Sequence, residues 1–398
     1  MNPKLDFSRQ TEPGTTVMIP SAQFAVTINL QRELDKSLPL GQKLILVHET
    51  LKNYCELVHR VAVALYDPKT DHVSTFLYSS EKDDPIVNYS VKLSEVRSLR
   101  DIAQGGSPRI INNLAVLAQQ KSLHTQKILF QGYQSSLTYP LYHNGSLFGF
   151  LFFNSYQKNT FVGSLLHLIG LFSQAIAALV IQETSVARTI AAAIRTTQNI
   201  ICHKNEETGA HLGRMSYYSR LIAAMLAQRH ELNDEFIEYI LLFSPMHDIG
   251  KIGIPDNLLC KPGKLTEDEF EVVKRHTTIG LEIVNNMAKE FSFENFPHIQ
   301  MLRNIVEMHH EAMNGSGYPN GARGKQIPIE ARICAVADIF DALTSRRCYK
   351  PAWSNEKAFL TLREMADTKL DSECVEALIG NPEKILEIQA NFAEDRNV

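Results

Sequence analysis

The feature that most constrains this chain is a helical apolar pattern in its middle, which starts at residue 165 and continues through residues 187–201. Its apolar residues recur at steps of three and four, with one polar break at Gln182: Leu165, Leu168, Phe172, Ala175, Leu179 and Val186. This spacing is typical of the seam between two helices. We expect a parallel dimer helix that passes strain between the two halves of the chain. The alternative is a helix packed on the sheet of its own domain.

The same region raises the question of a membrane span, because residues 165–181 form the longest apolar run. The run is slightly short for a span and carries His167, Ser173 and Gln174. Residues 1–16 have no apolar core behind their charges, so we expect no signal peptide. The six cysteines include no CxxC pair, which fits a reducing compartment. We therefore expect a cytoplasmic protein with no membrane segment.

The composition is that of an ordinary globular protein: 398 residues, of which 44% are apolar and 21% are charged. A chain of this size suffices for two or three domains. Its 40 basic and 44 acidic side chains give a net charge of -4, and no Lys/Arg stripe dominates any segment. This balance argues against a general nucleic-acid-binding protein.

The first half reads as a tail followed by an α+β domain. Residues 1–24 are polar and contain Pro13, Gly14 and Pro20, so we expect a loose tail. Helical spacing over residues 42–57 is followed by two strand patterns, RVAVALYDP and HVSTFLYSS. Asn144-Gly145 then separates two β-rich runs, which predicts a hairpin with a type I′ turn. Residues 25–160 are therefore expected to form a domain with an antiparallel sheet.

This order of elements resembles the GAF family of small-ligand sensor domains. The resemblance implies either a bound small ligand, whose identity stays open, or a dimerisation unit. Residues 161–200 would then be the connecting helix. Cys55, His59, His72 and His143 can be imagined around a haem or a metal. The alternative is that these four are ordinary surface residues without a bound ligand, which is the more frequent case for scattered polar residues.

Beyond residue 200 the strand signals nearly vanish, and we expect an all-α domain over residues 201–398. Six segments follow helical spacing: GAHLGRMSYYSRLIAAMLAQR, DEFIEYILLFSPMHDIGK, TEDEFEVVKRHTTIGLEIVNNM, IQMLRNIVEMHHE, EARICAVADIFDALTSR and KILEIQANFAED. Thr266 and Glu269 form a capping box that starts the third of them.

The helical half contains a set of imidazoles and carboxylates that packing does not require: Glu207, His211, His247, Asp248, His276, His309, His310 and Asp338. Glu207 and His211 are four residues apart, which places them on one helix face. His247 and Asp248 lie in an apolar segment that we expect to be helical, and Asp338 interrupts the apolar run VADIFDAL. A charge there is expensive unless it is paired or ligated. Each residue alone is a core or cap residue more often than a ligand, but the whole set predicts a metal site.

The donor types indicate the metals and the reaction. Nitrogen and oxygen donors without thiolate suit manganese, iron or zinc, and a carboxylate can bridge two ions. Eight candidate ligands exceed the need of one ion. Two or three close ions can clamp a phosphoryl oxygen, lower the pKa of water and neutralise charge on a leaving oxygen. The set therefore favours phosphoester hydrolysis.

Residues 247–280, HDIGKIGIPDNLLCKPGKLTEDEFEVVKRHTTIG, are followed by HHEAMNGSGYPNGARGKQIPIEARICAVADIFDALTSRRCYK at residues 309–350. Together they resemble the HD-GYP phosphodiesterases, a branch of the HD superfamily that hydrolyses the bacterial second messenger cyclic di-GMP. The resemblance covers about residues 185–380. It implies opening of cyclic di-GMP to linear pGpG and on to GMP. It also implies two or three divalent ions, Fe or Mn, and no organic cofactor.

The family's ligand positions carry over onto this sequence as His211, His247, Asp248, His276, His309, His310 and Asp338. Asp248 is the expected bridging carboxylate. Glu207 matches the acid that completes a third metal position in part of the family. Lys251 matches the lysine that contacts the scissile phosphate, so Lys251 and Asp248 are the expected catalytic residues. The alternative for Lys251 is an exposed helix lysine.

On the substrate side, Arg347 and Lys350 match positions that hold a phosphate or a guanine. Tyr318 can stack on guanine, and Gly317 and Pro319 complete the loop, although a Tyr-Pro turn is often only structural. The sequence departs from the family at a few nearby positions: Asn205, Met313, Asn314, Cys348 and a longer segment around residues 291–300. None of these departures removes a ligand.

Three functions remain open. The first is a cyclic di-GMP phosphodiesterase regulated by the N-terminal domain, with hydrolysis of a hybrid cyclic GMP-AMP as a variant. The second is a non-catalytic receptor or scaffold that binds a cyclic dinucleotide or a partner diguanylate cyclase. The third is a nucleotide phosphohydrolase of the wider HD superfamily, against which the GYP loop argues. In each case we expect a homodimer through the connecting helix.

Overall fold

The computed structural model describes residues 30–81, 86–117, 123–202, 209–291, 293–345 and 352–393, with backbone alone at residues 123–124 and 193–202. The chain divides into two compact units, Met1–Lys36 and Ser37–Val398. In the first unit only residues 30–36 are described, and residues 30–34 are helical. The expected tail over residues 1–24 lies outside the described residues.

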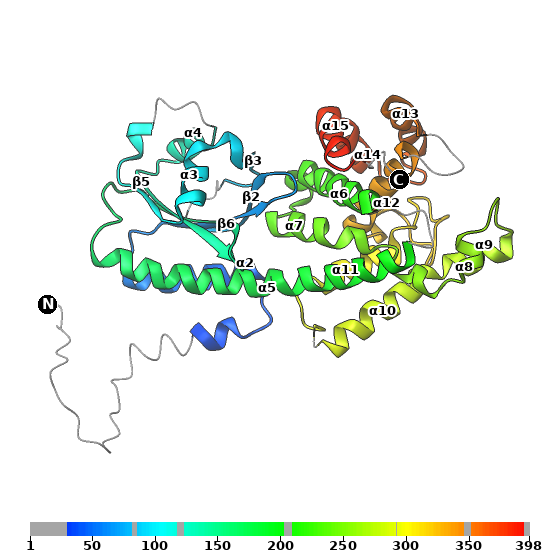
Figure 1. Cartoon of the computed structure of the whole chain (residues 1–398), viewed down its shortest axis with the longest axis horizontal. Helices are drawn as coiled ribbons and strands as arrows, with labels where there is room; N and C mark the ends of the chain where they lie inside the picture. Colours follow the sequence, from blue (N-terminus) through cyan, green and yellow to red (C-terminus); the bar gives the residue numbers. More distant parts are fainter. Residues whose placement is uncertain are drawn as a thin grey trace, which may run out of the picture. The chain divides into compact units, whose positions relative to one another are not determined.

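The first half of the larger unit is built on a six-stranded sheet in which every neighbouring pair is antiparallel (Figure 1). The strand order is β3-β2-β1-β6-β5-β4. The strands are β1 Arg60–Asp67, β2 His72–Ser80, β3 Ser90–Lys92, β4 Arg109–Ile111, β5 Ser135–His143 and β6 Ser146–Ser155. The antiparallel sheet expected for this half is thereby confirmed, although the three-residue edge strands β3 and β4 are too short for a sequence pattern to reveal.

The turn between β5 and β6 is the predicted hairpin. Asn144 and Gly145 both have positive φ, 50° and 76°, as a type I′ turn requires. Tyr142 pairs with Leu147, and His143 pairs with Ser146, directly beside the turn. This turn therefore sets the register of β5 and β6.

Helices cover both faces of the sheet. On one face, α3 (Arg97–Gly105) packs Leu99 and Ile102 against Ala62, Phe150 and Phe152 of the central strands. On the other face lie α2 (Leu40–Tyr54) and the first part of α5 (Figure 1). The remaining elements of this half are η1 Leu93–Glu95, η2 Leu114–Leu117 and α4 Leu123–Phe130. Successive side chains of a strand point to opposite faces, so the central strands β1 and β6, covered on both faces, are buried along most of their length.

The expected connecting helix is α5, Ser164–Cys202, with 39 residues. Its buried side chains include Ile169, Ile176 and Val180, which face the domain's own core. The part Ser164–Ala192 is long and apolar enough to cross a membrane by length and composition, and 22% of its most apolar window is buried. A core helix of a soluble protein passes the same test.

Ten helices make up the described part of the second half, and beyond α5 the described residues contain isolated bridges but no strand. They are α6 Gly209–His230, α7 Asp234–Phe243, α8 Asp256–Leu259, α9 Glu267–Lys274, α10 His276–Glu290, α11 Ile299–Met308, α12 Ile329–Thr344, α13 Asn355–Met365, α14 Ser372–Ile379 and α15 Pro382–Asn391. The Thr266–Glu269 capping box at the start of α9 is present. The expectation of an all-α second half is confirmed.

Two expected helices are broken, and the breaks correct the sequence interpretation. After α7 the chain forms two 3-10 turns, η3 Ser244–Met246 and η4 Ile249–Gly253, so His247 and Asp248 lie between turns and not in an α-helix. Pro245 explains this break, because proline lacks the N–H that would continue the helix.

The second break separates α9 from α10 at Arg275. Side chains take up the backbone carbonyls there: His276 Nδ1 donates to Val273 O at 2.7 Å, and Thr277 Oγ1 donates to Lys274 O at 3.1 Å. Side-chain donors of this kind compete with the helical ladder. The break places His276 at the first residue of a new helix.

Candidate metal centre

The predicted ligands come from five places in the helical half. His211 lies in the first turn of α6, and Asp338 lies within α12. His276 begins α10, while His309 and His310 directly follow α11. His247 and Asp248 come from the link between η3 and η4. Elements far apart in the sequence thus place the predicted ligands close together.

Two groups of side chains have ligand atoms within 4.8 Å of one another: Asp248, His276, His309 and His310 in one, and His211, His247 and Asp338 in the other. The two groups meet at the HD pair, where His247 Nε2 lies 2.9 Å from Asp248 Oδ2. The structure therefore brings together seven of the eight predicted ligands. Glu207, the eighth, lies outside the described residues.

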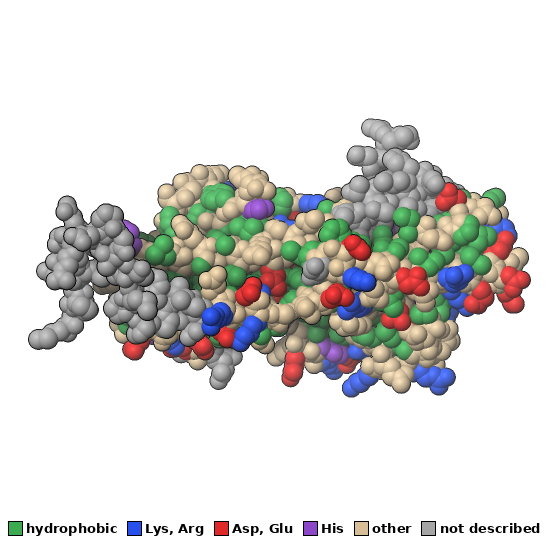
Figure 2. Space-filling model, turned by 90° about the horizontal axis from the view of Figure 1, so that it is seen from below, with side chains coloured by type: hydrophobic (Ala, Val, Ile, Leu, Met, Phe, Trp, Pro, Cys, Tyr) green, Lys and Arg blue, Asp and Glu red, His purple; other side chains and the backbone are tan. Residues whose placement is uncertain are grey.

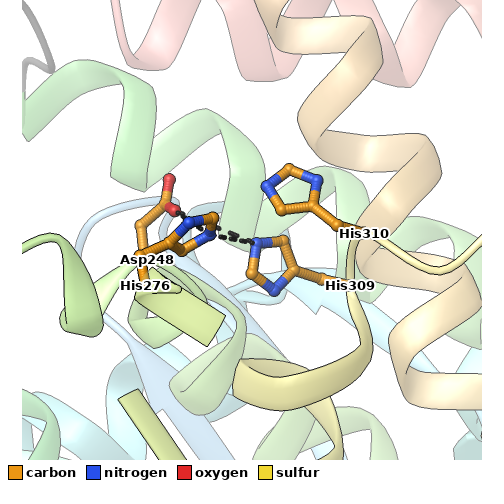
Figure 3. A group of neighbouring side chains, drawn as sticks. All are labelled: Asp248, His276, His309 and His310. Carbon is orange, nitrogen blue, oxygen red and sulfur yellow. Dashed lines mark hydrogen bonds and ion pairs between the residues drawn. The ribbon is translucent and has the colours of Figure 1, made fainter. Parts of the chain in front are cut away.

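The first group has the donor geometry of a cation site (Figure 3). His276 Nδ1 faces Val273 O at 2.7 Å, and His309 Nδ1 faces Ile305 O at 3.0 Å. A carbonyl only accepts, so each Nδ1 carries the proton and each Nε2 keeps a lone pair. These two Nε2 atoms lie 3.5 Å apart. Two lone pairs that face each other at this distance favour a positive ion between them.

The second group repeats this arrangement. His247 Nδ1 donates to Ser244 O at 2.9 Å, and His211 Nδ1 donates to Asp341 Oδ2 at 2.7 Å. Both imidazoles therefore carry their lone pair on Nε2. His247 Nε2 lies 3.9 Å from Asp338 Oδ1, in the same group. The donor set of nitrogen and carboxylate oxygen fits manganese, iron or zinc.

Asp248 lies between the two groups and is 6% exposed. Its Oδ1 is buried without a hydrogen-bond partner among the described residues and lies 3.2 Å from His276 Nε2 and 3.8 Å from His309 Nε2. Its Oδ2 faces His247 Nε2 at 2.9 Å and Lys251 Nζ at 2.7 Å. One oxygen toward each group is the geometry of a bridging carboxylate.

The protonation states favour metal binding at neutral pH. Burial lowers the pKa of His309 well below its ordinary value and lowers the pKa of His310 to about 4. Burial alone would raise the pKa of Asp248, but the charge of Lys251 and the contact with His247 outweigh it and hold that pKa well below the ordinary value. Neutral imidazoles and an ionised carboxylate are the forms that bind metal ions.

Two buried acids support the site, and sequence reasoning did not assign them a role. Asp341 binds His211 as described, and Glu311 accepts the backbone N–H groups of Asn320 at 2.7 Å and Ala322 at 2.9 Å. Both side chains are at most 5% exposed. A signal existed for Asp341, since it lies three residues after Asp338 in the same apolar run and so near it on one helix face.

The GYP loop lies against the first group. The Tyr318 ring centroid is 4.8 Å from that of His310 and 6.3 Å from that of His276. Gly317 packs against the backbone, where an added Cβ would overlap Ala312 N, and Tyr318-Pro319 is a cis peptide bond. The loop residue Asn314, where the family has aspartate, accepts the N–H of Ser316 at 2.9 Å. Arg347 and Lys350 lie outside the described residues.

Comparisons with known proteins match the two halves separately. Residues 195–374 match the family described as HD domain, and this range contains all seven predicted ligands that the structure brings together. The cyclic di-GMP phosphodiesterase response regulator RpfG of Xanthomonas campestris pv. campestris is 42% identical over 191 residues, 48% of each chain. A cyclic di-GMP phosphodiesterase of Vibrio cholerae is 36% identical over 228 residues, 56% of this chain and 46% of that protein.

A 3'3'-cGAMP-specific phosphodiesterase 2 of Vibrio cholerae is 35% identical over 196 residues, 49% of this chain and 35% of that protein. The matched region spans half or less of the length of these relatives. In the first half, the GAF domain of an Acinetobacter phosphoenolpyruvate-protein phosphotransferase is 13% identical with a TM-score of 0.33, covering 42% of this chain and 98% of that chain.

Proposed function

We propose that this chain, whose residues 195–374 form an HD domain, is a metal-dependent phosphodiesterase that opens cyclic di-GMP to linear pGpG and on to GMP. The observation that carries the proposal is the pair of ligand groups joined at Asp248, with Lys251 Nζ 2.7 Å from the same carboxylate. Relatives named as cyclic di-GMP phosphodiesterases match the same region. Each role below follows from this proposal.

The ligand roles are assigned to His211, His247, Asp248, His276, His309, His310 and Asp338, with Glu207 for a third ion. Asp248 would bridge two bound ions, because its two oxygens face different groups. Iron or manganese suits these donors. Bound divalent ions supply Lewis acidity toward phosphoryl oxygens and activate water. Lys251 brings one positive charge to the same place, where it stabilises a phosphorane-like transition state or protonates the leaving oxygen.

The substrate roles belong to the loop and to the segment after α12. Tyr318 offers a ring for guanine beside His310, supported by the 4.8 Å ring distance. Gly317 and Pro319 shape the loop that holds this ring. Arg347 and Lys350 are proposed to bind a phosphate or a guanine, on the strength of the sequence resemblance alone.

A hybrid cyclic GMP-AMP is the alternative substrate, because relatives of similar identity include a 3'3'-cGAMP-specific enzyme. A non-catalytic receptor or scaffold for cyclic dinucleotide or a diguanylate cyclase is the alternative from another class. The complete set of seven described ligands favours the hydrolase over the receptor. Both alternatives make different predictions in the experiment below.

We further propose a homodimer through α5. The residues of the predicted seam stay outside the core: Leu165, Leu168, Phe172, Leu179 and Val186 are half-buried and Ala175 is exposed. A partly exposed apolar stripe of this kind is stabilised when another apolar surface packs on it. Its spacing of three and four residues fits a second copy of the same helix.

The proposed domain bounds are residues 25–160 for the GAF-like sensor, 161–200 for the connecting helix and 201–398 for the phosphodiesterase. The sensor is proposed to regulate the enzyme through a small ligand or through dimerisation, in the cytoplasm and without nucleic acid or membrane. Lys/Arg and Asp/Glu side chains are interspersed over the face shown in Figure 2, which supports the absence of a nucleic-acid surface there.

The experiment is anaerobic purification, metal analysis, and chromatography of cyclic di-GMP after incubation with the protein plus Mn²⁺ or Fe²⁺. Linear pGpG or GMP, with two or three metal ions per chain, supports the hydrolase. Intact cyclic di-GMP beside cleaved cyclic GMP-AMP supports the hybrid substrate. Two intact substrates on a metal-filled protein favour the receptor. The double variant His247→Ala with Asp248→Ala is the control that should lose turnover while it stays folded.

A further inference from the structure

We propose that Asp341 is a positioning residue that serves both sides of the site: it orients His211 for the second ligand group and anchors the chain where it leaves α12 toward the proposed substrate residues. This inference rests on the proposed function, since it assumes that the ligand groups hold metal ions. It assigns a role to a carboxylate that binds no ion itself.

The contact with His211 fixes both the tautomer and the orientation of the imidazole. Asp341 is 0% exposed, and its Oδ2 lies 2.7 Å from His211 Nδ1. Because a carboxylate accepts, the proton of a neutral His211 stays on Nδ1 and the lone pair stays on Nε2. The Nε2 atom then belongs to the group with His247 and Asp338. Partners of this kind are known to set the affinity of metal-binding histidines.

The oxygens of Asp341 are fully engaged by protein donors, which separates its role from that of a ligand. Oδ1 accepts from Arg214 Nε at 2.6 Å. Oδ2 accepts from His211 Nδ1, from Arg214 Nη2 at 3.2 Å and from Ser345 Oγ at 2.9 Å. Four donors surround one buried carboxylate. Asp341 therefore acts through His211 and not on an ion.

Arg214 supplies the charge that lets this carboxylate be buried. It lies three residues after His211 on α6, so both side chains reach Asp341 from one helix face. Its Nη1 also donates to Phe392 O at 3.0 Å, just beyond the end of α15. The two-point contact of the guanidinium with Asp341 restricts the rotation of the carboxylate. The pair thus holds the acceptor for His211 in one orientation.

Ser345 connects this network to the substrate side. It is the residue that ends α12, and its Oγ lies 2.9 Å from Asp341 Oδ2 and 2.7 Å from Arg214 Nη2. Arg347, the proposed substrate residue, is two positions further along the chain. Asp341 therefore links a metal ligand and the origin of the substrate segment through a single carboxylate.

The test compares Mn²⁺ binding by the metal-free full chain and its Asp341→Asn variant, measured by calorimetry and by metal analysis, without nucleotide. The variant should lose one ion per chain or bind it roughly 10- to 100-fold more weakly. The ion of the group with Asp248, His276, His309 and His310 should stay. Unchanged stoichiometry and affinity in a folded variant would overturn the inference.

The matched control is Asp371→Asn. Asp371 is also a buried carboxylate of the helical half, 5% exposed, with an arginine partner, Arg332 Nη1, at 2.5 Å. It caps α14 and contacts no proposed ligand. Its variant should melt at a lower temperature but bind Mn²⁺ as the unaltered chain does. Equal loss of Mn²⁺ in both variants would reduce Asp341 to a structural role and overturn the proposal.

Ser345→Ala provides a second test, which can still be carried out if the Asp341→Asn variant does not fold. Loss of this one hydrogen bond should raise KM for cyclic di-GMP by about fivefold, with Mn²⁺ binding and kcat unchanged. An unchanged KM would overturn the substrate-side half of the inference. If the unaltered chain binds no Mn²⁺, the proposed function is wrong. If the unaltered chain and the Asp341→Asn variant bind Mn²⁺ equally well, only the inference about Asp341 is wrong.

Discussion

Lys251 Nζ lies 2.7 Å from Asp248 Oδ2, on the carboxylate whose other oxygen faces the imidazoles of His276 and His309. The lysine thus stands where negative charge would gather during hydrolysis, and it does so without being a ligand. Its role can be separated from metal binding by substitution.

Lys251→Met should lower kcat by about 100- to 1,000-fold, the range for removal of one charge-stabilising donor. The metal content should stay unchanged, because Lys251 donates no lone pair to an ion. Steady-state kinetics and metal analysis of the same preparation check this prediction. Lys264→Met, at an exposed position in the same half, is the control and should keep full activity. A Lys251 variant with normal kcat would remove this residue from the chemistry.

Metal removal should destabilise the protein, since the lone pairs of His276 and His309 face each other at 3.5 Å. Chelation should lower the melting temperature, and Mn²⁺ at about 100 times its Kd should restore roughly 2.7 kcal/mol. Thermal unfolding with and without Mn²⁺ measures both effects. His309→Ala should abolish most of the Mn²⁺-dependent rise. His298→Ala should retain it, because His298 stacks on Tyr239 and binds Glu235 instead.

Acidification should destabilise the sheet domain, because His48 is buried there. Burial lowers the pKa of His48 below 6.5, and the hydrogen bond to Val58 O offsets only part of this effect. The ring stays neutral in the folded state, with Nδ1 2.8 Å from Ser79 Oγ and Nε2 2.9 Å from Val58 O. The unfolded ring takes up its proton as the pH falls through 6.5, so the unfolded state binds more protons below that pH.

The free energy of unfolding should therefore fall from about pH 7.5 to about pH 5.5, and His48→Gln should reduce that fall. Denaturant unfolding at the two pH values, followed by a probe of the sheet domain, gives the measurement. His143→Gln changes an exposed histidine of the same sheet and should keep the slope of the unaltered protein. Equal slopes in all three proteins would contradict the assignment to His48.

Gly317→Ala should displace the GYP loop. A Cβ at this position would overlap Ala312 N and come within 2.5 Å of Glu311 Cα and His310 O, all of which are poorly able to move. We expect a loss of about 1–3 kcal/mol in stability and a higher KM for cyclic di-GMP. Gly209→Ala, where no described residue lies within 4 Å, is the control and should neither lower the stability nor raise KM.

Charges on the seam of α5 should separate the proposed dimer. Leu168→Glu with Leu179→Glu places two carboxylates on the stripe that remains outside the core. Light scattering should show a monomer in place of a dimer, while circular dichroism stays unchanged. Leu360→Glu, at a side chain that is 62% exposed on α13, should leave the dimer intact. A double variant that stays dimeric would place the interface elsewhere.

The parts of the structure that the sequence predicted are those with a local signal. Asn144-Gly145 requires positive φ at two successive residues, and few structures other than a tight hairpin supply it. The residues that come together in the two groups were predictable for a related reason, because charged groups such as Asp338 interrupt apolar runs where burial would be costly. Periodicity likewise predicted the start of α5 within one residue, since the apolar pattern begins at Leu165 and the helix begins at Ser164.

The parts that the sequence did not predict depend on contacts across the chain or on local competition. Asp341 meets His211 from 130 residues away, so its role arises only when α6 packs against α12. The break before His276 depends on side-chain donors that capture carbonyls of the preceding turn. Pro245 was visible, but its effect on the helix around the HD pair was underestimated.

The link between η3 and η4 has a consequence for how the two ion positions relate. His247 belongs to one ligand group and Asp248 to the other, and the two residues share one peptide unit, which holds consecutive Cα atoms 3.8 Å apart. The distance between the two ligand groups is therefore set in part by covalent geometry. Thermal motion of the helices does not change this geometry. Filling one position immobilises the peptide that presents the ligand of the other. Mn²⁺ titration should consequently show a second ion that binds more readily after the first.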